Sequence, residues 1–436
     1  MFKSFLLIAL LLNSVSFGDA IDDEFDDGFG DEIGEEIVIE DVKKKDYYFL
    51  GNIEQKAHYA THNTAPHNDL NSFRSALYLE SEYSFNENHK IRMSADGFYD
   101  FIYDINSDRV YTPQEKDDLK YEAEIFDFYV QGKLSSNFDY KIGRQIVIWG
   151  RSDTIRVTDI LNPLDNRTPG VVDIEDLRLP VGMLKFDYYL GNWNANIIVV
   201  GETRYSKNPV YGSDFYPFVF LPPEDKKEQK PALALSLSGT FSAWDISLYA
   251  AKTTSDEGHI EVIVGKPTII HEDIYMLGYA FNFIHDNWLF KTEAGFFDGY
   301  KFTLTGDKTF KKLDALVGVE YNGIDETVIA FELANNHIFN YESVLKSQVI
   351  PVLKDTTQYA LRINSDFFNA TLHANYLVSL FGKDMRDGGF SRIWFDYDVN
   401  DYFSAELGYV DYLSGSKLFD ILHDNDMLFG SLKYSF

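Results

Sequence analysis

From Asp46 to Phe436, apolar and polar residues alternate with a period of two, and no other feature of the sequence constrains the fold as strongly. In one stretch, Trp244, Ile246 and Leu248 alternate with polar residues. In an extended strand, such neighbours point to opposite faces of the sheet. A soluble sandwich shows the same alternation, but it does not usually sustain it over about 390 residues with many aromatic residues near strand ends. The pattern therefore predicts an all-β protein, a transmembrane antiparallel up-and-down β-barrel.

The composition agrees with this prediction. Aromatic residues make up 16% of the 436 residues, mainly as 36 Phe and 29 Tyr. The mean hydropathy is nevertheless slightly negative, at -0.24. This combination is unusual in a soluble protein and is expected where apolar residues occupy every second position of a barrel. A chain of this length is also too long for one compact core unless the fold is a large barrel or a multi-domain array.

Short and long connections alternate along the chain. The short ones are rich in Asn, Asp and Gly, which tolerate left-handed backbone and form turns. The long ones are residues 104–120, 151–180, 206–230, 253–272 and 337–355. Short periplasmic turns and long external loops are typical of outer-membrane barrels. We count about eighteen strands, within an expected range of 16–18, centred near residues 53, 78, 95, 126, 144, 186, 198, 236, 248, 279, 293, 317, 331, 361, 375, 394, 407 and 431. An even count places both chain ends on the periplasmic side, and a barrel of this size can leave a water-filled lumen.

The first 18 residues have the pattern of a signal peptide. Lys3 supplies the positive start, residues 5–12 are apolar, and Ser16-Phe17-Gly18 forms a small-x-small cleavage pattern, with cleavage after Ala20 as the alternative. The apolar run is too short to span a bilayer as a helix, and no later run of about 18 apolar residues predicts a transmembrane helix. The absence of cysteine excludes disulfides, thiolate metal sites and a lipoprotein anchor.

Residues 19–45 are strongly acidic and carry little apolar surface, so we expect a disordered periplasmic segment. A calcium site is the alternative, because carboxylate oxygens suit this ion, but the residues do not follow EF-hand spacing. The formal net charge of the whole chain is -30. Such an acidic protein is not expected to bind nucleic acid or to be attracted to anionic lipid.

The last residues form an alternating strand that ends in an aromatic residue. Leu428, Gly430, Leu432, Tyr434 and Phe436 share one face. A terminal Phe with an aromatic residue two positions earlier resembles the signal that the outer-membrane assembly machinery reads. We therefore expect that machinery as a partner and localisation in the bacterial outer membrane, where the barrel contacts lipid and lipopolysaccharide.

If the apolar face meets lipid, the opposite face lines the lumen. Arg or Lys facing lipid at mid-membrane would cost roughly 2–4 kcal/mol each. The predicted lumen residues are Arg74, Glu80, Glu82, Arg92, Asp96, Lys141, Lys185, Asp187, Lys291, Glu293, Arg362, Arg392 and Asp396. Arg144 breaks the rule, because its parity matches Ile142 and Ile146. We favour a bulge near Gly143, with an interfacial Arg144 as the alternative.

One connection, residues 151–180, interrupts the strand pattern for about thirty residues. It follows the fifth strand, the position from which the third external loop of general porins folds inward, and we expect it to constrict the lumen. Its charged residues are Arg151, Asp153, Arg156, Asp159, Asp165, Arg167, Asp173, Glu175, Asp176 and Arg178. The alternative is that these charges only hydrate the lumen and brace the wall as ion pairs.

The sequence around this loop resembles a bacterial family of porin-like outer-membrane β-barrels catalogued mainly as a domain of unknown function. The resemblance rests on Gly143-Arg144-Gln145 with Trp149-Gly150, on residues 159–165 (DILNPLD) and on residues 175–180 (EDLRLP). It implies an outer-membrane barrel involved in solute passage, with no settled substrate.

These patterns predict a porin-like channel for small solutes with a charged, loop-constricted lumen. One alternative is a gated or plugged barrel for an apolar compound, suggested by the aromatic loop around Tyr205, Tyr211, Phe215, Tyr216, Phe218 and Phe220. A structural or adhesin barrel is another, and a homo-oligomer remains an alternative to a monomer. We expect no enzyme, metal or cofactor, because no G-x-S-x-G or H-E-x-x-H motif occurs and His373 and Ser379 would lie roughly 20 Å apart along one strand.

Overall fold

The computed structural model describes residues 46–436, apart from 62–68, 107–108 and 175. The predicted signal peptide (1–18) and the acidic segment (19–45) lie outside the described residues. Within the described part of the chain, no helix is both long and apolar enough to cross a membrane.

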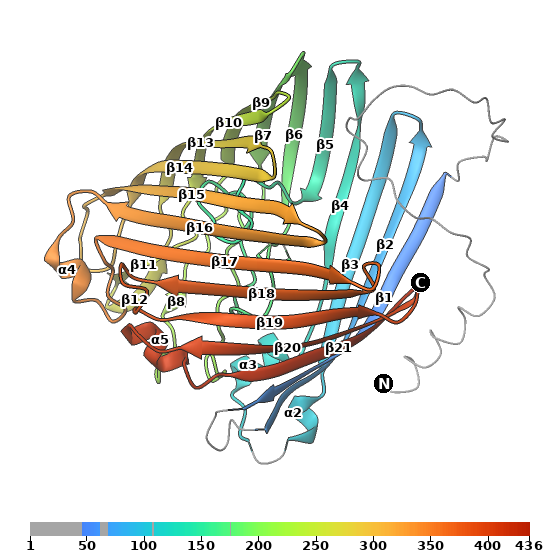
Figure 1. Cartoon of the computed structure of the whole chain (residues 1–436). Helices are drawn as coiled ribbons and strands as arrows, with labels where there is room; N and C mark the ends of the chain where they lie inside the picture. Colours follow the sequence, from blue (N-terminus) through green and yellow to red (C-terminus); the bar gives the residue numbers. More distant parts are fainter. Residues whose placement is uncertain (1–45, 62–68, 107–108, 175) are drawn as a thin grey trace, which may run out of the picture. The chain divides into compact units, whose positions relative to one another are not determined.

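Eighteen antiparallel strands form one closed sheet, in which each strand pairs with the next and the last pairs with the first (Figure 1). All eighteen predicted strand centres lie within these strands, so the predicted barrel and its strand count are confirmed. The strands are β1 (Tyr47–Ala60), β2 (Asp69–Asn86), β3 (His89–Asp100), β4 (Tyr121–Ser135), β5 (Phe138–Gln145), β6 (Val181–Leu190), β7 (Trp193–Val200), β9 (Ala232–Thr240), β10 (Trp244–Thr254), β13 (Asp273–His285), β14 (Trp288–Tyr300), β15 (Phe310–Ile324), β16 (Thr327–Ile338), β17 (Asp355–Phe367), β18 (Leu372–Phe381), β19 (Gly389–Asp398), β20 (Phe403–Leu413) and β21 (Met427–Ser435).

The barrel closes at a seam between β1 and β21. Nine residue pairs form the seam, from Asn52 opposite Ser435 to Ala60 opposite Met427. The backbone N–H of Phe436 donates to the carbonyl of Gly51 at 2.9 Å and extends the pairing by one residue. A closed sheet leaves no strand edge with unpaired backbone groups. Such an edge would be too costly in the hydrocarbon of a bilayer.

The long connections carry small elements that the alternation does not predict. Two external loops contribute strands to a three-stranded sheet, made of β8 (Glu224–Asp225), β11 (His259–Ile263) and β12 (Lys266–Ile270). Four short helices are described: α2 (Ile102–Ile105), α3 (Pro113–Leu119), α4 (Ser343–Lys346) and α5 (Lys417–Leu422). The sequence sets the start of α3, where Thr112 and Glu115 form a capping box.

The outer surface of the barrel is apolar, as the alternation predicts. Leu235 on β9 is 43% exposed and Leu277 on β13 is 65% exposed, whereas their neighbours Ala234 and Met276 are buried. Apolar side chains that are exposed at every second position suit contact with lipid acyl chains. The side chains between them then face the inside of the barrel.

The inner surface is not polar throughout. Toward the long loops, Ile198, Met276 and Phe297 point inward and form an apolar cluster with Val147 and Trp149 from the connection after β5. Fully burying side chains of this kind stabilises a fold by about 1.5–3 kcal/mol each. The cluster therefore holds this connection against the inner wall, and it corrects the expectation of a lumen lined only by polar residues.

The predicted bulge at Gly143 is wrong. The pairing of β5 with β4 and β6 runs without a shift through Gly143, and Arg144 lies opposite the exposed Phe128. Arg144 instead reaches the carbonyl of Ile125 at 2.8 Å and the carboxylate of Glu202 at 3.4 Å. It lies at the loop end of its strand, where an outward cation finds polar partners.

Candidate functional site

The connection between β5 and β6 begins earlier than predicted, at residue 146 instead of 151, and runs to 180. We call residues 146–180 the inner loop. Its first turn is held by Trp149, which stacks on Tyr249 of β10 with ring centroids 4.7 Å apart. The hydroxyl of Tyr249 also accepts a hydrogen bond from the Gly150 N–H at 3.2 Å. The loop thus turns onto the inner face of the wall as soon as β5 ends.

Two wall carboxylates bind the backbone of the inner loop. Glu293 of β14 accepts from the N–H of Arg151 at 2.9 Å and from the N–H and hydroxyl of Thr158 at 2.7 and 2.6 Å. Glu332 of β16 accepts from the Ser152 hydroxyl at 2.7 Å. Hydrogen bonds to charged acceptors contribute about 1.5–3 kcal/mol each, so these two residues fix this part of the loop.

Glycine is required where the inner loop passes Glu293. Gly150 has φ of +91°, and a Cβ at this position would lie 2.7 Å from a carboxylate oxygen of Glu293. Any other residue would be strained there and would press on the anchor.

Ion pairs join the same segment to neighbouring strands. The Arg151 guanidinium donates to Asp245 of β10 at 2.8 Å. Asp153 pairs with Lys291 of β14, which also contacts Glu320 of β15 at 3.2 Å. Lys291 is buried, so each partner it has in this network matters more than a surface pair would.

A buried carboxylate within the loop holds two guanidinium groups. Asp159 lies 2.8 Å from the Nε of Arg178 and 3.3 Å from the Nε of Arg156. Burial lowers the pKa of Arg156, and the positive charge of Arg178 lowers it further, while Asp159 opposes both effects. The arrangement concentrates two positive charges on one negative charge at the side of the loop that faces the wall.

Asn162 ties together the two ends of the inner loop. Its side-chain oxygen accepts from the Val147 N–H at 2.9 Å, and its amide donates to the carbonyls of Leu179 at 2.9 Å and Gln145 at 3.3 Å. Asn162 is fully buried, and an amide is the side chain that can both donate and accept at this point.

The far part of the loop reaches the opposite region of the wall. Asp173 pairs with Arg362 of β17 at 2.9 Å and with Arg392 of β19. Arg392 also donates to the backbone carbonyl of Val171. One carboxylate thereby connects the loop to two strands.

A further contact joins the loop to β4. Arg167 donates to Asp165 at 2.9 Å and pairs with Glu122 at 2.8 Å. Burial raises the pKa of Asp165, but the hydrogen bonds and charge of Arg167 outweigh burial and lower the pKa below its usual value.

The structure brings most of the predicted site residues together. The loop residues described above contact one another or the wall, and Arg362 and Arg392 meet them through Asp173. Asp176 contributes a backbone N–H to the Asp173 carbonyl at 3.1 Å, and Glu175 lies outside the described residues.

Three predicted lumen residues make their main contacts within the wall instead. Arg74 lies over the Phe98 ring at 3.8 Å, Arg92 pairs with Glu80 at 2.9 Å, and Lys141 lies over the Tyr129 ring at 3.8 Å. Arg74 also approaches the inner loop, because Arg167 lies near the same Phe98 ring.

The loop anchors on the wall were not singled out from the sequence. Glu293 was predicted only as a lumen residue, and Asp245 and Glu332 were not predicted as site residues. Their strand parity indicates that they face inward, and that was the available signal. Their pairing with loop residues depends on the fold, since Glu332 and Ser152 are 180 positions apart.

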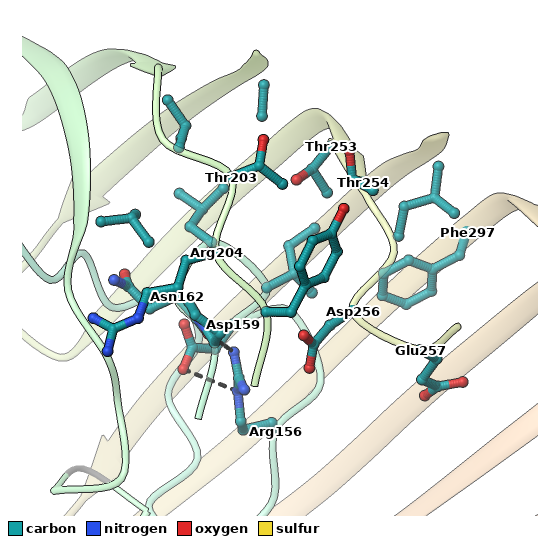
Figure 2. Close-up of a pocket in the computed structure, with 18 of the residues that line it drawn as sticks. Arg156, Asp159, Asn162, Thr203, Arg204, Thr253, Thr254, Asp256, Glu257 and Phe297 are labelled. Atoms are coloured by element: carbon teal, nitrogen blue, oxygen red, sulfur yellow. Dashed lines mark hydrogen bonds and ion pairs between the residues drawn. The ribbon is translucent and has the colours of Figure 1, made fainter. Parts of the chain in front are cut away.

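A cavity of about 200 Å³ lies between the inner loop and the loop ends of β6 to β15, and we call it the loop cavity (Figure 2). Arg156 and Asp159 line it from the loop. The wall and the neighbouring external loops contribute acidic and aromatic side chains, among them Asp256, Glu257, Phe297 and Tyr300.

Solved structures with the same architecture define the class of this protein. Acinetobacter baumannii OccAB4 is 13% identical over 90% of this chain and 99% of its own, with a TM-score of 0.54. Acinetobacter baumannii OccAB3 is 12% identical over 90% and 99%, with a TM-score of 0.53. Pseudomonas aeruginosa OpdK, solved with vanillate, is 9% identical over 90% and 98%, with a TM-score of 0.54. The fold is that of a porin-like outer-membrane β-barrel.

The family follows from the sequence itself. The model of the family described as "Protein of unknown function (DUF1302)" matches residues 50–436, and the chain belongs to this family. The resemblance inferred from the motif is thereby confirmed. No curated protein matches the chain.

Proposed function

We propose that this protein is a channel of the bacterial outer membrane that lets small solutes pass through a charged lumen narrowed by the inner loop. One observation carries the proposal: the inner loop is bound to inward-facing side chains on β4, β10, β14, β16, β17 and β19. A loop with anchors on strands all around a closed barrel crosses the lumen and reduces its cross-section.

The charge of the barrel supports a preference for cations. Of the 69 acidic and 39 basic residues in the chain, 12 and 4 precede Asp46, which leaves a formal charge of -22 on the barrel region. Channels select ions through the field of the charged side chains along the pore. A reversal potential measured in a salt gradient tests this part, and clear anion selectivity would contradict it.

Single-channel recording of the full chain in a planar bilayer tests the channel itself. We expect a steady ohmic conductance. A variant that loses two anchors, Glu293→Ala with Glu332→Ala, should conduct more than the native protein, because the loop can then leave the lumen. Glu224→Gln, at an exposed position on β8, serves as the matched control. A protein that inserts and remains silent would contradict the proposal.

A second candidate function is favoured by a separate observation. The connection between β7 and β9 carries an aromatic group in which Phe218 stacks on Phe220 at 5.1 Å, and Phe220 is half exposed. Phe215 of the same connection packs into the barrel against Tyr412 at 5.6 Å. An apolar compound bound by these exterior aromatic residues would meet further apolar side chains inside the barrel. Binding of such a compound to a barrel that does not conduct ions would favour this alternative.

His373 and Ser379 share one face of β18, where a catalytic pair could be considered. His373 pairs with Asp366 at 2.6 Å, whereas the Ser379 hydroxyl accepts from Gln358 at 3.0 Å. The histidine and the serine therefore have separate partners and do not form a proton relay. Hydrolysis of a phospholipid or peptide panel by the purified barrel would contradict this assignment.

A further inference from the structure

The loop cavity carries opposite charges on different walls. Arg156 belongs to the inner loop, whereas Asp256 and Glu257 belong to the connection between β10 and β13. Figure 2 shows these three side chains around one space, with Phe297 beyond them. A solute in this cavity would meet Arg156 on one side and Asp256 and Glu257 on another. Arg204, Lys230 and Lys312 also line the space.

The guanidinium has binding capacity to spare. Arg156 Nε is buried and makes no hydrogen bond to the described residues, and the nearest carboxylate oxygen, on Asp159, lies 3.3 Å away. That same oxygen already accepts from Arg178 at 2.8 Å. The one hydrogen bond described for the guanidinium runs from its Nη2 to the Asn162 carbonyl at 2.8 Å. The buried Nε already lies against Asp159, so a planar carboxylate from a solute would bind the remaining Nη donors.

The carboxylates of Asp256 and Glu257 can also accept further hydrogen bonds. Asp256 is exposed and accepts only from the N–H and hydroxyl of Ser206, at 2.8 and 2.6 Å, among the described contacts. Glu257 is 68% exposed, and its nearest described cation is Lys312 at 4.0 Å. Asp256 has no described ion pair and Glu257 has only the long contact with Lys312, so both can accept hydrogen bonds from an ammonium group.

The wall between these charges is aromatic. Phe297 and Tyr300 line the cavity and meet edge to face, with centroids 5.9 Å apart. A binding site typically combines an apolar surface with a few polar groups that fix the orientation of the ligand. Phe297 and Tyr300 are only 1% and 7% exposed, and the Lys312 ammonium lies 5.1 and 4.6 Å from their ring centroids, so these rings offer a solute little open surface.

We propose that the loop cavity is a binding site for zwitterionic solutes of amino-acid size. The solute carboxylate binds Arg156, and its ammonium binds Asp256 and Glu257. A solute with a single charge leaves the charged groups on one side of the cavity without a partner, and such unpaired polar groups weaken binding. This inference rests on the proposed channel and assigns a solute class to it.

Three probes that share a phenylethyl group test the proposal on the full chain in a planar bilayer. Phenylalanine carries both charges, 3-phenylpropionate only the carboxylate, and 2-phenylethylamine only the ammonium. We expect phenylalanine to interrupt the current for about tenfold longer per event than either other probe, the ratio that the loss of one charged hydrogen bond produces. Equal or longer interruptions by 2-phenylethylamine would overturn the proposal in favour of simple attraction of cations.

Matched variants locate the effect. Arg156→Gln should shorten the interruptions by phenylalanine to the duration seen with 2-phenylethylamine. Glu257→Gln with Asp256→Asn should shorten them to the duration seen with 3-phenylpropionate. Glu257→Gln alone removes an exposed charge with no close partner, so it tests the site even if Arg156→Gln disturbs the loop. Glu224→Gln, outside the cavity, should leave the interruptions unchanged.

The experiment separates the two proposals. A conducting channel whose current phenylalanine does not interrupt overturns the binding site and leaves the channel in place. A silent barrel overturns the channel, and the solute class falls with it. Calorimetric titration of the detergent-purified barrel with phenylalanine gives a second readout, and the absence of binding there would also overturn the site.

Discussion

Glu293 on β14 and Thr158 in the inner loop are joined twice, because one carboxylate oxygen accepts both the backbone N–H and the hydroxyl of Thr158, at 2.7 and 2.6 Å. The second oxygen binds the Arg151 N–H, so one buried side chain holds two points of the loop seven residues apart. A single wall residue thus fixes two points of the loop in the lumen.

Replacement of this anchor should loosen the loop without opening the barrel. Glu293→Ala leaves three donors without their acceptor, at a cost of about 1–3 kcal/mol each where they stay buried. We expect a larger and noisier single-channel current, together with an unchanged shift in gel mobility on boiling, because strand pairing holds the barrel. Glu293→Gln keeps one acceptor oxygen and should have a smaller effect. Native-like current in the Ala variant would show that the anchor is dispensable.

Asp173 should influence selectivity through the two guanidinium groups that it pairs. Asp173→Asn removes a negative charge and leaves Arg362 and Arg392 without their shared partner. We expect the reversal potential in a salt gradient to move toward anions. Asp307→Asn removes the same charge at an exposed loop position and should produce a smaller shift. Equal shifts in both variants would mean that only the total charge matters.

Asn162 should hold the two ends of the inner loop together. Asn162→Ala removes three hydrogen bonds in a fully buried place, and each unsatisfied group costs about 1–3 kcal/mol. Amide hydrogen exchange should accelerate across residues 146–180 and remain slow in the barrel strands. Asn162→Asp keeps the acceptor for Val147 but places a buried carboxylate oxygen against the carbonyls of Leu179 and Gln145, so exchange at least as fast as in the Ala variant is expected. If exchange rose in the strands as well, the residue would support the barrel and not the loop alone.

Acid should break the pair between Asp165 and Arg167 within the inner loop and so weaken the hold on Arg167, which contacts Glu122 of β4. The pKa of Asp165 lies below its usual value of 3.8, because the effect of Arg167 exceeds that of burial. A lowered pKa in the folded state means that the ion pair contributes fully above pH of about 4 and is lost as the pH falls through the lower, folded value. The part of the conductance that depends on this ion pair should therefore change only below about pH 4.

Asp165→Asn is the control for that acid transition. The variant lacks the titrating group, so its conductance at neutral pH should already resemble that of the acidified native channel. An acid transition of undiminished size in this variant would assign the effect to other carboxylates.

The sequence predicted the barrel well because one physical rule governs every strand. Leu235 and Leu277 face outward, while Ala234 and Met276 face inward, and the same parity holds wherever a wall separates two environments. The rule gives no information about short strands in loops. β8 pairs with β12 through residues such as Glu224 and Thr268, which lie 44 positions apart, and that pairing depends on tertiary contact.

The candidate site was predicted less completely. Charge pattern and position identified the loop and most of its ionic residues, but neither reveals which wall residue each one meets. Met276 and Phe297 show why the inner surface was mispredicted, since parity assigns a side chain to the lumen without revealing that a folded loop covers it there. Arg144 shows the same limit at the rim, where polar partners permit an outward cation.

The seam between β1 and β21 has a practical consequence for this cysteine-free chain. Ala57 and Gly430 lie directly opposite each other there, although 373 positions separate them. Two thiols introduced at this pair would have no native competitor, and their oxidation would turn the wall into a covalent ring. Formation of this disulfide in a living cell would report when the first and last strands of the barrel pair.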